Sequence, residues 1–242
     1  MDSTPRDQLI VALDTGDLSA ALDMVRRLGD EVAWYKVGLQ LFSAAGPSAV
    51  RTLRREGKRV FLDLKLHDIP NTVTQAALQG ADLGADLIDL HVAAGAEAMR
   101  AAAEALQARY RDRERPRLLG VTVLTSLRRL ADQGELSPAG LVEAVVARAL
   151  EAQAAGLDGV VAPAPAAAEV RRRCGAAFRL LTPGIRPSGA ERADQQWIAT
   201  PQSARAAGAD WIVVGRPITA APDPVAAARE ILGALAAPPA DI

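Results

Sequence analysis

Residues 61–73 read FLDLKLHDIPNTV, and three charged residues, Asp63, Lys65 and Asp68, follow one another at the end of an apolar run. Successive side chains of a β-strand point to opposite faces, so Asp63 and Lys65 would share one face while the leucines beside them share the other. We expect the leucines to pack against helices, the two charges to point the opposite way, and Asp68 to lie on the following loop. The stretch therefore predicts a strand covered by helices on one face, with charged groups gathered at its carboxyl end.

Short β-branched runs of this kind recur along the chain, and stretches with helical periodicity and good helix formers separate them. Alternating strands and helices imply parallel strands joined by helical crossovers, and eight such units favour a closed barrel. We therefore predict an α/β fold, a (β/α)8 TIM barrel. An open doubly wound sheet is the alternative, weakened because no Gly-x-Gly-x-x-Gly follows the first run. The eight runs span residues 9–14, 34–39, 59–64, 87–92, 118–124, 159–163, 179–184 and 211–215.

The chain has 242 residues, half of them hydrophobic, which is enough to bury a substantial core. A barrel of this length is a common single domain, and no linker or low-complexity segment interrupts the sequence. We predict one barrel domain over residues 1–242, with a short frayed tail at 237–242.

The charge pattern excludes several classes of partner. The formal net charge is -1 with acidic and basic residues interspersed, so we expect neither nucleic acid nor a membrane surface as partner. Arg, Asp or Glu interrupts every long apolar stretch, which excludes a membrane-spanning helix. The single cysteine, Cys174, and a polar amino terminus without a signal-like apolar region predict a cytoplasmic protein that binds a small molecule.

Charged residues stand on three of the predicted strands, where a buried apolar side chain would be usual: Asp14, Lys36, Asp63 and Lys65. An isolated charge in a dry interior costs several kcal/mol, so we expect these groups to pair, each acid beside a lysine. One such pair would indicate a structural ion pair. A network at the carboxyl ends of barrel strands, where enzymes of this fold keep their active sites, favours a catalytic site instead.

Two further segments suggest an anion site at the same end of the barrel. Gly215 and Arg216 follow the eighth run, and the loops after the last two barrel strands often cradle a phosphate. The polar loop 182–201 is long for its position and carries Arg186 and Gln195, which could close on an anionic ligand as a lid. The alternatives are an ordinary surface arginine and a solvated loop.

The two histidines, His67 and His91, lack the spacing of a metal site. Asp89 shares a predicted strand face with His91, which leaves a metal site barely possible. We expect both histidines to serve packing or to support other residues. Cys174 follows three arginines on a predicted helix surface, where an incidental thiol is expected.

The motif Asp-x-Lys-x-x-Asp-Ile-Pro-Asn-Thr resembles the active-site strand of the orotidine 5'-phosphate decarboxylase family, whose members catalyse the last step of UMP synthesis. Related sugar-phosphate enzymes share its first part, but four other segments match the family in order and spacing, so that the likeness spans the whole chain. They are ALD at 12–14, YKVGLQLF at 35–42, TPGIRPSG with Asp-Gln at 194–195, and VVGRPITAAPDP at 213–224.

The resemblance implies a homodimer that decarboxylates orotidine 5'-monophosphate to UMP without a cofactor or a metal. Lys65 would protonate C6 of the pyrimidine, Asp63 would lie beside the substrate carboxylate, and Lys36 and Asp14 would bind the ribose and order the charges. Asp68 would reach into the partner subunit's site together with Ile69 and Thr72. The remaining implied contacts are Arg186, Gln195, Gly215 and Arg216 for the phosphate, and Thr125 and Ser126 for the base.

Two other functions remain possible at this point. A magnesium-dependent lyase or decarboxylase of keto-sugar phosphates from the same superfamily would need the metal to stabilise an enediolate. A non-catalytic barrel that binds nucleotides would need no costly cluster such as Asp63, Lys65 and Asp68, which argues against it. Metal dependence separates the first alternative from the decarboxylase.

Overall fold

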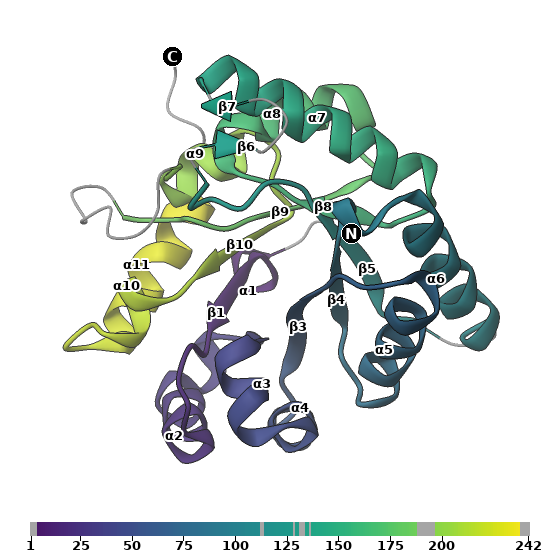
Figure 1. Cartoon of the computed structure of the whole chain (residues 1–242). Helices are drawn as coiled ribbons and strands as arrows, with labels where there is room; N and C mark the ends of the chain where they lie inside the picture. The colour runs from purple at the N-terminus through teal and green to yellow at the C-terminus, as the bar shows by residue number, and fades with distance from the viewer. Residues whose placement is uncertain are drawn as a thin grey trace.

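A computed structural model describes residues 4–111, 114–127, 129–130, 134–135, 137–187 and 197–237. Eight parallel strands close into a barrel in the order β1-β10-β9-β8-β5-β4-β3-β2, which confirms the predicted TIM barrel over the open sheet (Figure 1). Each of the eight predicted runs overlaps one of these strands. The strands are β1 Leu9–Ala12, β2 Trp34–Gly38, β3 Arg59–Leu66, β4 Leu87–His91, β5 Arg117–Val121, β8 Gly159–Val161, β9 Arg179–Thr182 and β10 Trp211–Val214.

Helices surround the strands in Figure 1 and follow them in turn along the chain. Side-chain caps begin several of them: the Asp17 carboxylate accepts the Ser19 N–H, and the Ser137 hydroxyl accepts the Gly140 N–H. The main helices are α2 Leu18–Leu28, α3 Leu39–Ala45, α4 Pro47–Arg55, α5 Pro70–Asp82, α6 Ala96–Arg109, α7 Pro138–Ala154, α8 Ala164–Cys174, α9 Pro201–Ala206 and α11 Pro224–Ala236. Shorter elements are α1 Pro5–Gln8, η1 Gly29–Glu31, η2 Val92–Ala94, α10 Arg216–Thr219 and the antiparallel pair β6 Arg129–Leu130 and β7 Gly134–Glu135.

Residues 218–235 have the composition of one long helix but do not form a continuous one. The short helix α10 ends at Thr219, and α11 begins after Asp223, whose carboxylate accepts the N–H groups of Val225 and Ala226. Proline at 224 suits the first helical position because its missing N–H would have no partner there. Among the described residues, no helix is long and apolar enough to cross a membrane. The predicted tail lies outside the described residues from 238 onward.

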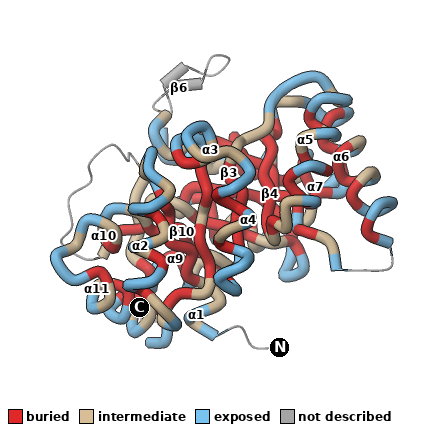
Figure 2. The backbone as a smooth tube through the Cα atoms, turned by 90° about the horizontal axis from the view of Figure 1, so that it is seen from below, coloured by how far each residue is buried: buried red, intermediate tan, exposed pale blue. Residues whose placement is uncertain are grey.

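The core has two shells, which follow from the alternation of side chains along each strand. Ten buried residues, among them Ile10, Phe61 and Leu181, fill the barrel interior. Their strand neighbours, such as Leu62, pack outward against the helices, and Figure 2 shows the buried residues concentrated along the strands and the inner sides of the helices. Cys174 belongs to this outer shell with 8% exposure, so its predicted surface position is wrong. Burial also raises the pKa of its thiol.

A repeated Gly-x-Asp pattern braces the amino-terminal end of the barrel. Asp86, Asp158 and Asp210 each stand directly before a strand, and each follows a glycine with a φ of 94, 86 or 93°. Such left-handed backbone favours glycine because it has no Cβ. Each carboxylate accepts the N–H of the second residue in the adjacent strand, and each also binds an arginine. The N–H donors are Val60 at 2.7 Å, Leu118 at 2.7 Å and Leu180 at 2.8 Å, and the arginines are Arg54, Arg115 and Arg171.

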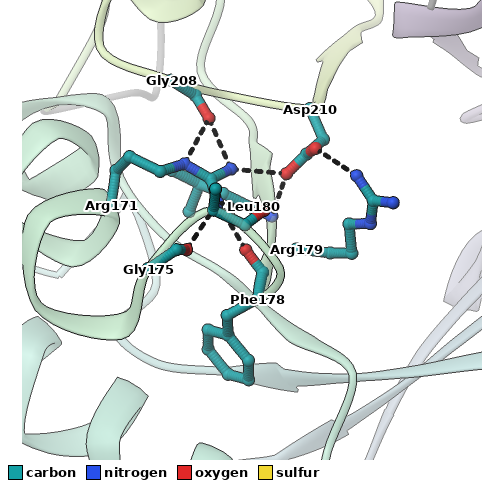
Figure 3. Close-up of polar contacts among 8 residues, drawn as sticks. Arg171, Gly175, Phe178, Arg179, Leu180, Gly208 and Asp210 are labelled. Carbon is teal, nitrogen blue, oxygen red and sulfur yellow. Dashed lines mark hydrogen bonds and ion pairs between the residues drawn. The ribbon is translucent and has the colours of Figure 1, made fainter. Parts of the chain in front are cut away.

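The brace around Asp210 is the most extensive of the three, as Figure 3 shows. The Arg171 guanidinium donates to the carbonyl oxygens of Gly175, Phe178 and Gly208, at 2.9, 2.7 and 2.7 Å, and reaches Asp210 at 2.6 Å. Arg179 donates to the other oxygen of Asp210 at 2.8 Å. These bonds tie α8 and the loops around it to β9 and β10. The strands are therefore fixed at this end, and their carboxyl ends at the opposite end carry the charged residues.

Candidate active site

Four charged side chains form an alternating chain at the carboxyl ends of the first three strands. The Lys36 ammonium on β2 lies 2.8 Å from Asp14 Oδ1 and 3.2 Å from Asp63 Oδ2. The Lys65 ammonium on β3 binds the other oxygen of Asp63. The structure thus brings together the four residues in the predicted alternation. Asp14 lies two residues beyond the end of β1 rather than within that strand.

Burial and pairing fix the charges at the centre of this chain. The side chains of Lys36 and Asp63 are 12% and 10% exposed, against 32% for Lys65 and 57% for Asp14. Burial alone would raise the pKa of Asp63, but the Lys36 and Lys65 ammonium groups outweigh it and lower the pKa to about 2. Burial likewise opposes the charge of Lys36, and Asp63 and Asp14 outweigh it and raise the pKa of that ammonium. Lys36 and Asp63 are therefore a fixed ion pair at neutral pH.

The backbone at Lys65 departs from the regular strand that the sequence predicted. Lys65 has a φ of 49°, and among the described residues it is the only one other than glycine with a positive φ. The pairing of β3 with β4 also shifts register between Leu62 and Leu66. A non-glycine residue in this region costs about 1–3 kcal/mol and persists where its surroundings hold it. Asp89 on β4 provides one such constraint, because its Oδ1 accepts the Lys65 N–H at 2.8 Å.

Asp89 is a member of the site that the sequence did not identify. The residue is 1% exposed, and its carboxyl lies next to that of Asp63. Burial, followed by the charge of Asp63, raises the pKa of Asp89 well above its ordinary value. The only signal in the sequence was an acidic residue on a predicted strand. In a regular strand its side chain would share a face with His91.

The two histidines lie beside the charged chain, and their rings stack with centroids 5.5 Å apart. His91 Nδ1 accepts the Ala93 N–H at 3.2 Å. Burial lowers the pKa of His91, and the charges of His67, Arg148 and Lys65 lower it further. In the part of the chain that the structure describes, no cluster of three or more His, Cys, Asp or Glu side chains could hold a metal ion.

The residues after β3 face solvent in the single chain. Asp68 and Thr72 are exposed, and Asp68 Oδ1 accepts the N–H of Ile69 at 2.7 Å. Ile69 is 65% exposed, which is unusual for a large apolar residue, and Leu39, the residue after β2, is 58% exposed. Both residues follow strands that carry the charged chain, so two exposed apolar side chains lie at this end of the barrel.

The two predicted anion-binding arginines lie close enough to repel each other. Arg186 is 8% exposed, and burial together with the charge of Arg216 lowers the pKa of its guanidinium. Arg216 follows β10 and is exposed, and a Cβ placed on its neighbour Gly215 would lie 3.7 Å from Asp14 Oδ2. The charge of one guanidinium therefore acts on the other, and Gly215, the neighbour of Arg216, lies near Asp14 at the end of the charged chain.

The ends of the predicted lid are held together, although its middle, including Gln195, lies outside the described residues. Ile185 and Ala199 form a parallel bridge, and Arg186 N–H donates to the Ala199 carbonyl at 2.9 Å. Trp197 Nε1 donates to the Leu127 carbonyl at 3.3 Å, which joins this segment to the loop after β5. That loop carries the half-buried Thr125 and the exposed Ser126, the residues predicted to lie near the base.

Gly38, at the end of β2, is a second residue whose importance the sequence did not reveal. A Cβ at this position would lie 2.7 Å from Lys36 Nζ and 3.4 Å from Asp14 Oδ1. The backbone there has a φ of -94°, which any residue can adopt. Glycine is therefore required for the space that the Lys36 ammonium occupies, and a sequence pattern alone does not show this.

Comparison with known proteins gives one consistent result. Residues 7–231 match the model of the family described as "Orotidine 5'-phosphate decarboxylase / HUMPS family". An orotidine 5'-phosphate decarboxylase of Moorella thermoacetica is 50% identical over 229 residues, which cover 93% of this chain and 91% of the relative. That of Syntrophotalea carbinolica is 48% identical over 238 residues, 96% of each chain. A crystal structure of the Lactobacillus acidophilus enzyme superimposes with a TM-score of 0.82 at 35% identity, covering 96% of this chain and all of that one.

Proposed function

This chain belongs to the orotidine 5'-phosphate decarboxylase / HUMPS family, and on that basis we propose that it converts orotidine 5'-monophosphate to UMP and carbon dioxide, the last step of de novo pyrimidine synthesis. The observation that carries the proposal is the chain Asp14–Lys36–Asp63–Lys65 at the mouth of the barrel. Its central ion pair is buried and its outer ammonium, Lys65, is partly open, so a ligand can reach that ammonium.

The proposed chemistry is a decarboxylation at C6 of the pyrimidine with Lys65 as the acid. The bond between C6 and the carboxylate carbon breaks, carbon dioxide leaves, and the electron pair stays on C6. The Lys65 ammonium stabilises this developing charge and then transfers a proton from Nζ to C6. Lys65 regains a proton from solvent. The step balances without an oxidant, a reductant or a metal, so we propose that no cofactor takes part.

We assign Asp63 to holding both ammonium groups beside the reacting carbon. Its two oxygens bind Lys36 and Lys65, and these charges keep its pKa near 2, so it stays ionised throughout the reaction. A substrate carboxylate placed next to it would be repelled, and this repulsion disappears as carbon dioxide leaves.

The phosphate, the ribose and the base have separate candidate contacts. Arg186 and Arg216 form the cationic pair that would bind the phosphate, together with Gly215 and Gln195. Asp14 lies near Gly215 and is paired with Lys36, so these two side chains would meet the ribose hydroxyls. Binding energy from the phosphate would then orient the distant reacting carbon. Thr125 and Ser126, on the loop after β5, would contact the base.

We further propose a cytoplasmic homodimer with shared active sites. Asp68 and Thr72 are exposed, and the apolar surface formed by Ile69 and Leu39 suits a subunit interface. In such a dimer Asp68, Ile69 and Thr72 would enter the partner subunit's site. The lone Cys174, buried and unpaired, fits a reducing compartment.

UMP formation by the purified protein in excess EDTA tests the activity. We expect rapid conversion, and we expect it to be lost in Lys65→Ala. Lys58→Ala is the matched control, because Lys58 Nζ binds the Val32 carbonyl at 3.2 Å and Lys58 lies just before β3, at the end of that strand away from Lys65. Conversion that requires magnesium would indicate the keto-sugar-phosphate type of chemistry instead. No conversion with or without magnesium would reject the decarboxylase.

A further inference from the structure

Asp89 is the most deeply buried acid near the charged chain, and the mechanism above gives it no part. It lies in the middle of β4 with 1% exposure, and its Oδ1 accepts the Lys65 N–H at 2.8 Å. Its Oδ2 receives no hydrogen bond from the part of the chain that the structure describes. The Asp63 carboxyl lies within hydrogen-bonding reach of it. Two carboxyl groups thus face each other in a site from which water is largely excluded.

The two groups cannot both be ionised at moderate cost, because neighbouring like charges in a buried site repel strongly. Asp63 has two ammonium partners, Lys36 and Lys65, one on each oxygen. Asp89 has a backbone N–H in place of an ammonium. The proton shared by the pair therefore belongs on Asp89, and its O–H can donate to the Asp63 carboxylate.

We propose that Asp89 is a positioning residue for the decarboxylation, a neutral carboxylic acid that accepts the Lys65 N–H and donates to the Asp63 carboxylate. The first bond holds the left-handed turn at Lys65, which the backbone would otherwise avoid. The second bond orients the carboxylate that binds the Lys65 ammonium. Asp89 thus fixes Lys65 from both its backbone and its side chain. The positioning role rests on the proposed function, whereas the protonated state of Asp89 does not depend on it.

The protonation state has a test that does not depend on activity. The infrared difference spectrum of wild type minus Asp89→Asn at neutral pH should contain the carbonyl stretch of a protonated carboxyl group, with the small shift that such a group shows in heavy water. A spectrum that contains only carboxylate bands would overturn the proposal. Because the measurement needs no substrate, it stands even if the protein fails to decarboxylate orotidine 5'-monophosphate.

The positioning role is tested by two substitutions at the same site. Asparagine has a carbonyl that can accept the Lys65 N–H and an amide that can donate to Asp63, so it replaces a neutral acid well and an ionised one poorly. Asp89→Ala should lower kcat about 10- to 100-fold with little change in KM, as expected for a misplaced catalytic group. Asp89→Asn should recover most of that loss.

Asp86→Ala is the matched control for lost stability. Asp86 lies three positions before Asp89, directly before the start of β4, and its carboxylate also accepts a strand N–H, from Val60 at 2.7 Å. The control should lower Tm and keep the wild-type kcat below its melting range. Equal kcat losses in Asp86→Ala and Asp89→Ala would show that Asp89 is only a structural residue and would overturn its positioning role. An Asp89→Asn protein that is no more active than Asp89→Ala would also overturn it.

Discussion

Gly38→Ala should reduce catalysis without destabilising the fold. The added Cβ would lie 2.7 Å from Lys36 Nζ. Ordinary contacts between non-bonded heavy atoms begin near 3.5 Å, so the ammonium must retreat by about 0.8 Å. Its 2.8 Å bond to Asp14 Oδ1 would then stretch or break. Hydrogen bonds to charged groups contribute about 1.5–3 kcal/mol, and a misplacement of about 1 Å in an active site costs on the order of 100-fold. We therefore expect kcat/KM to fall between about 10- and 100-fold.

Stability should behave differently from activity in the same protein. The φ of -94° at Gly38 is open to alanine, and replacing glycine at such a position stabilises by about 0.4–1 kcal/mol through the unfolded chain. The gain offsets part of the strained contact, so Tm should stay near that of the wild type. Gly233→Ala, a helix position where a Cβ meets nothing within 4 Å, is the control and should keep full activity. Wild-type kcat/KM in Gly38→Ala would refute the argument that this glycine makes room for the Lys36 ammonium.

Three more predictions follow from the charged groups. Inactive Lys65→Ala and Asp68→Ala proteins, when mixed, should regain activity through hybrid dimers with one intact site; proven subunit exchange without recovery would contradict shared sites. The folded-state pKa of Asp63 is about 2 and the ordinary value is 3.8, so its contribution of about 2 kcal/mol is present above pH 3.8 and is lost as pH falls toward 2. Urea unfolding across this range should show a loss that Asp63→Asn lacks. Asp210→Ala should cost about 3 kcal/mol of unfolding free energy with unchanged kcat, because it removes the carboxylate that accepts the Leu180 N–H and binds Arg171 and Arg179; a urea midpoint equal to that of the wild type would show that the brace is unnecessary.

The barrel and most of its charged chain were predictable from sequence for a simple reason. Parallel strands separated by helices have few ways to close, and a closed barrel brings all carboxyl ends together. Residues as distant as Asp14, Lys36 and Asp63 then had to meet, and they do. The prediction depended only on where strands end, and strand ends are marked by the change from apolar to charged residues.

The residues that were missed depend on local geometry that a two-residue period does not encode. The irregular backbone at Lys65 brings its N–H to Asp89, and no pattern in FLDLKLHD reveals a positive φ at a lysine. Cys174 was placed on a surface because three arginines precede it. The four-residue spacing from Val170 instead carries it to the buried face of α8. In both cases the environment of the residue is set by its neighbours in space, and the adjacent residues in the sequence do not predict it.

The two ends of the barrel use the same residue types in different ways. At the amino-terminal end, Asp86, Asp158 and Asp210 each accept a backbone N–H and bind an arginine, so removing any of them should damage the fold. At the carboxyl-terminal end, Asp63 divides its oxygens between two lysine ammonium groups, one buried and one partly open. A backbone N–H is held in place by its strand, whereas the more exposed ammonium, that of Lys65, can turn from Asp63 toward a substrate. The difference explains why an acid at one end stabilises strands, and it would let the acid at the other end hold the proposed proton donor, Lys65, ready.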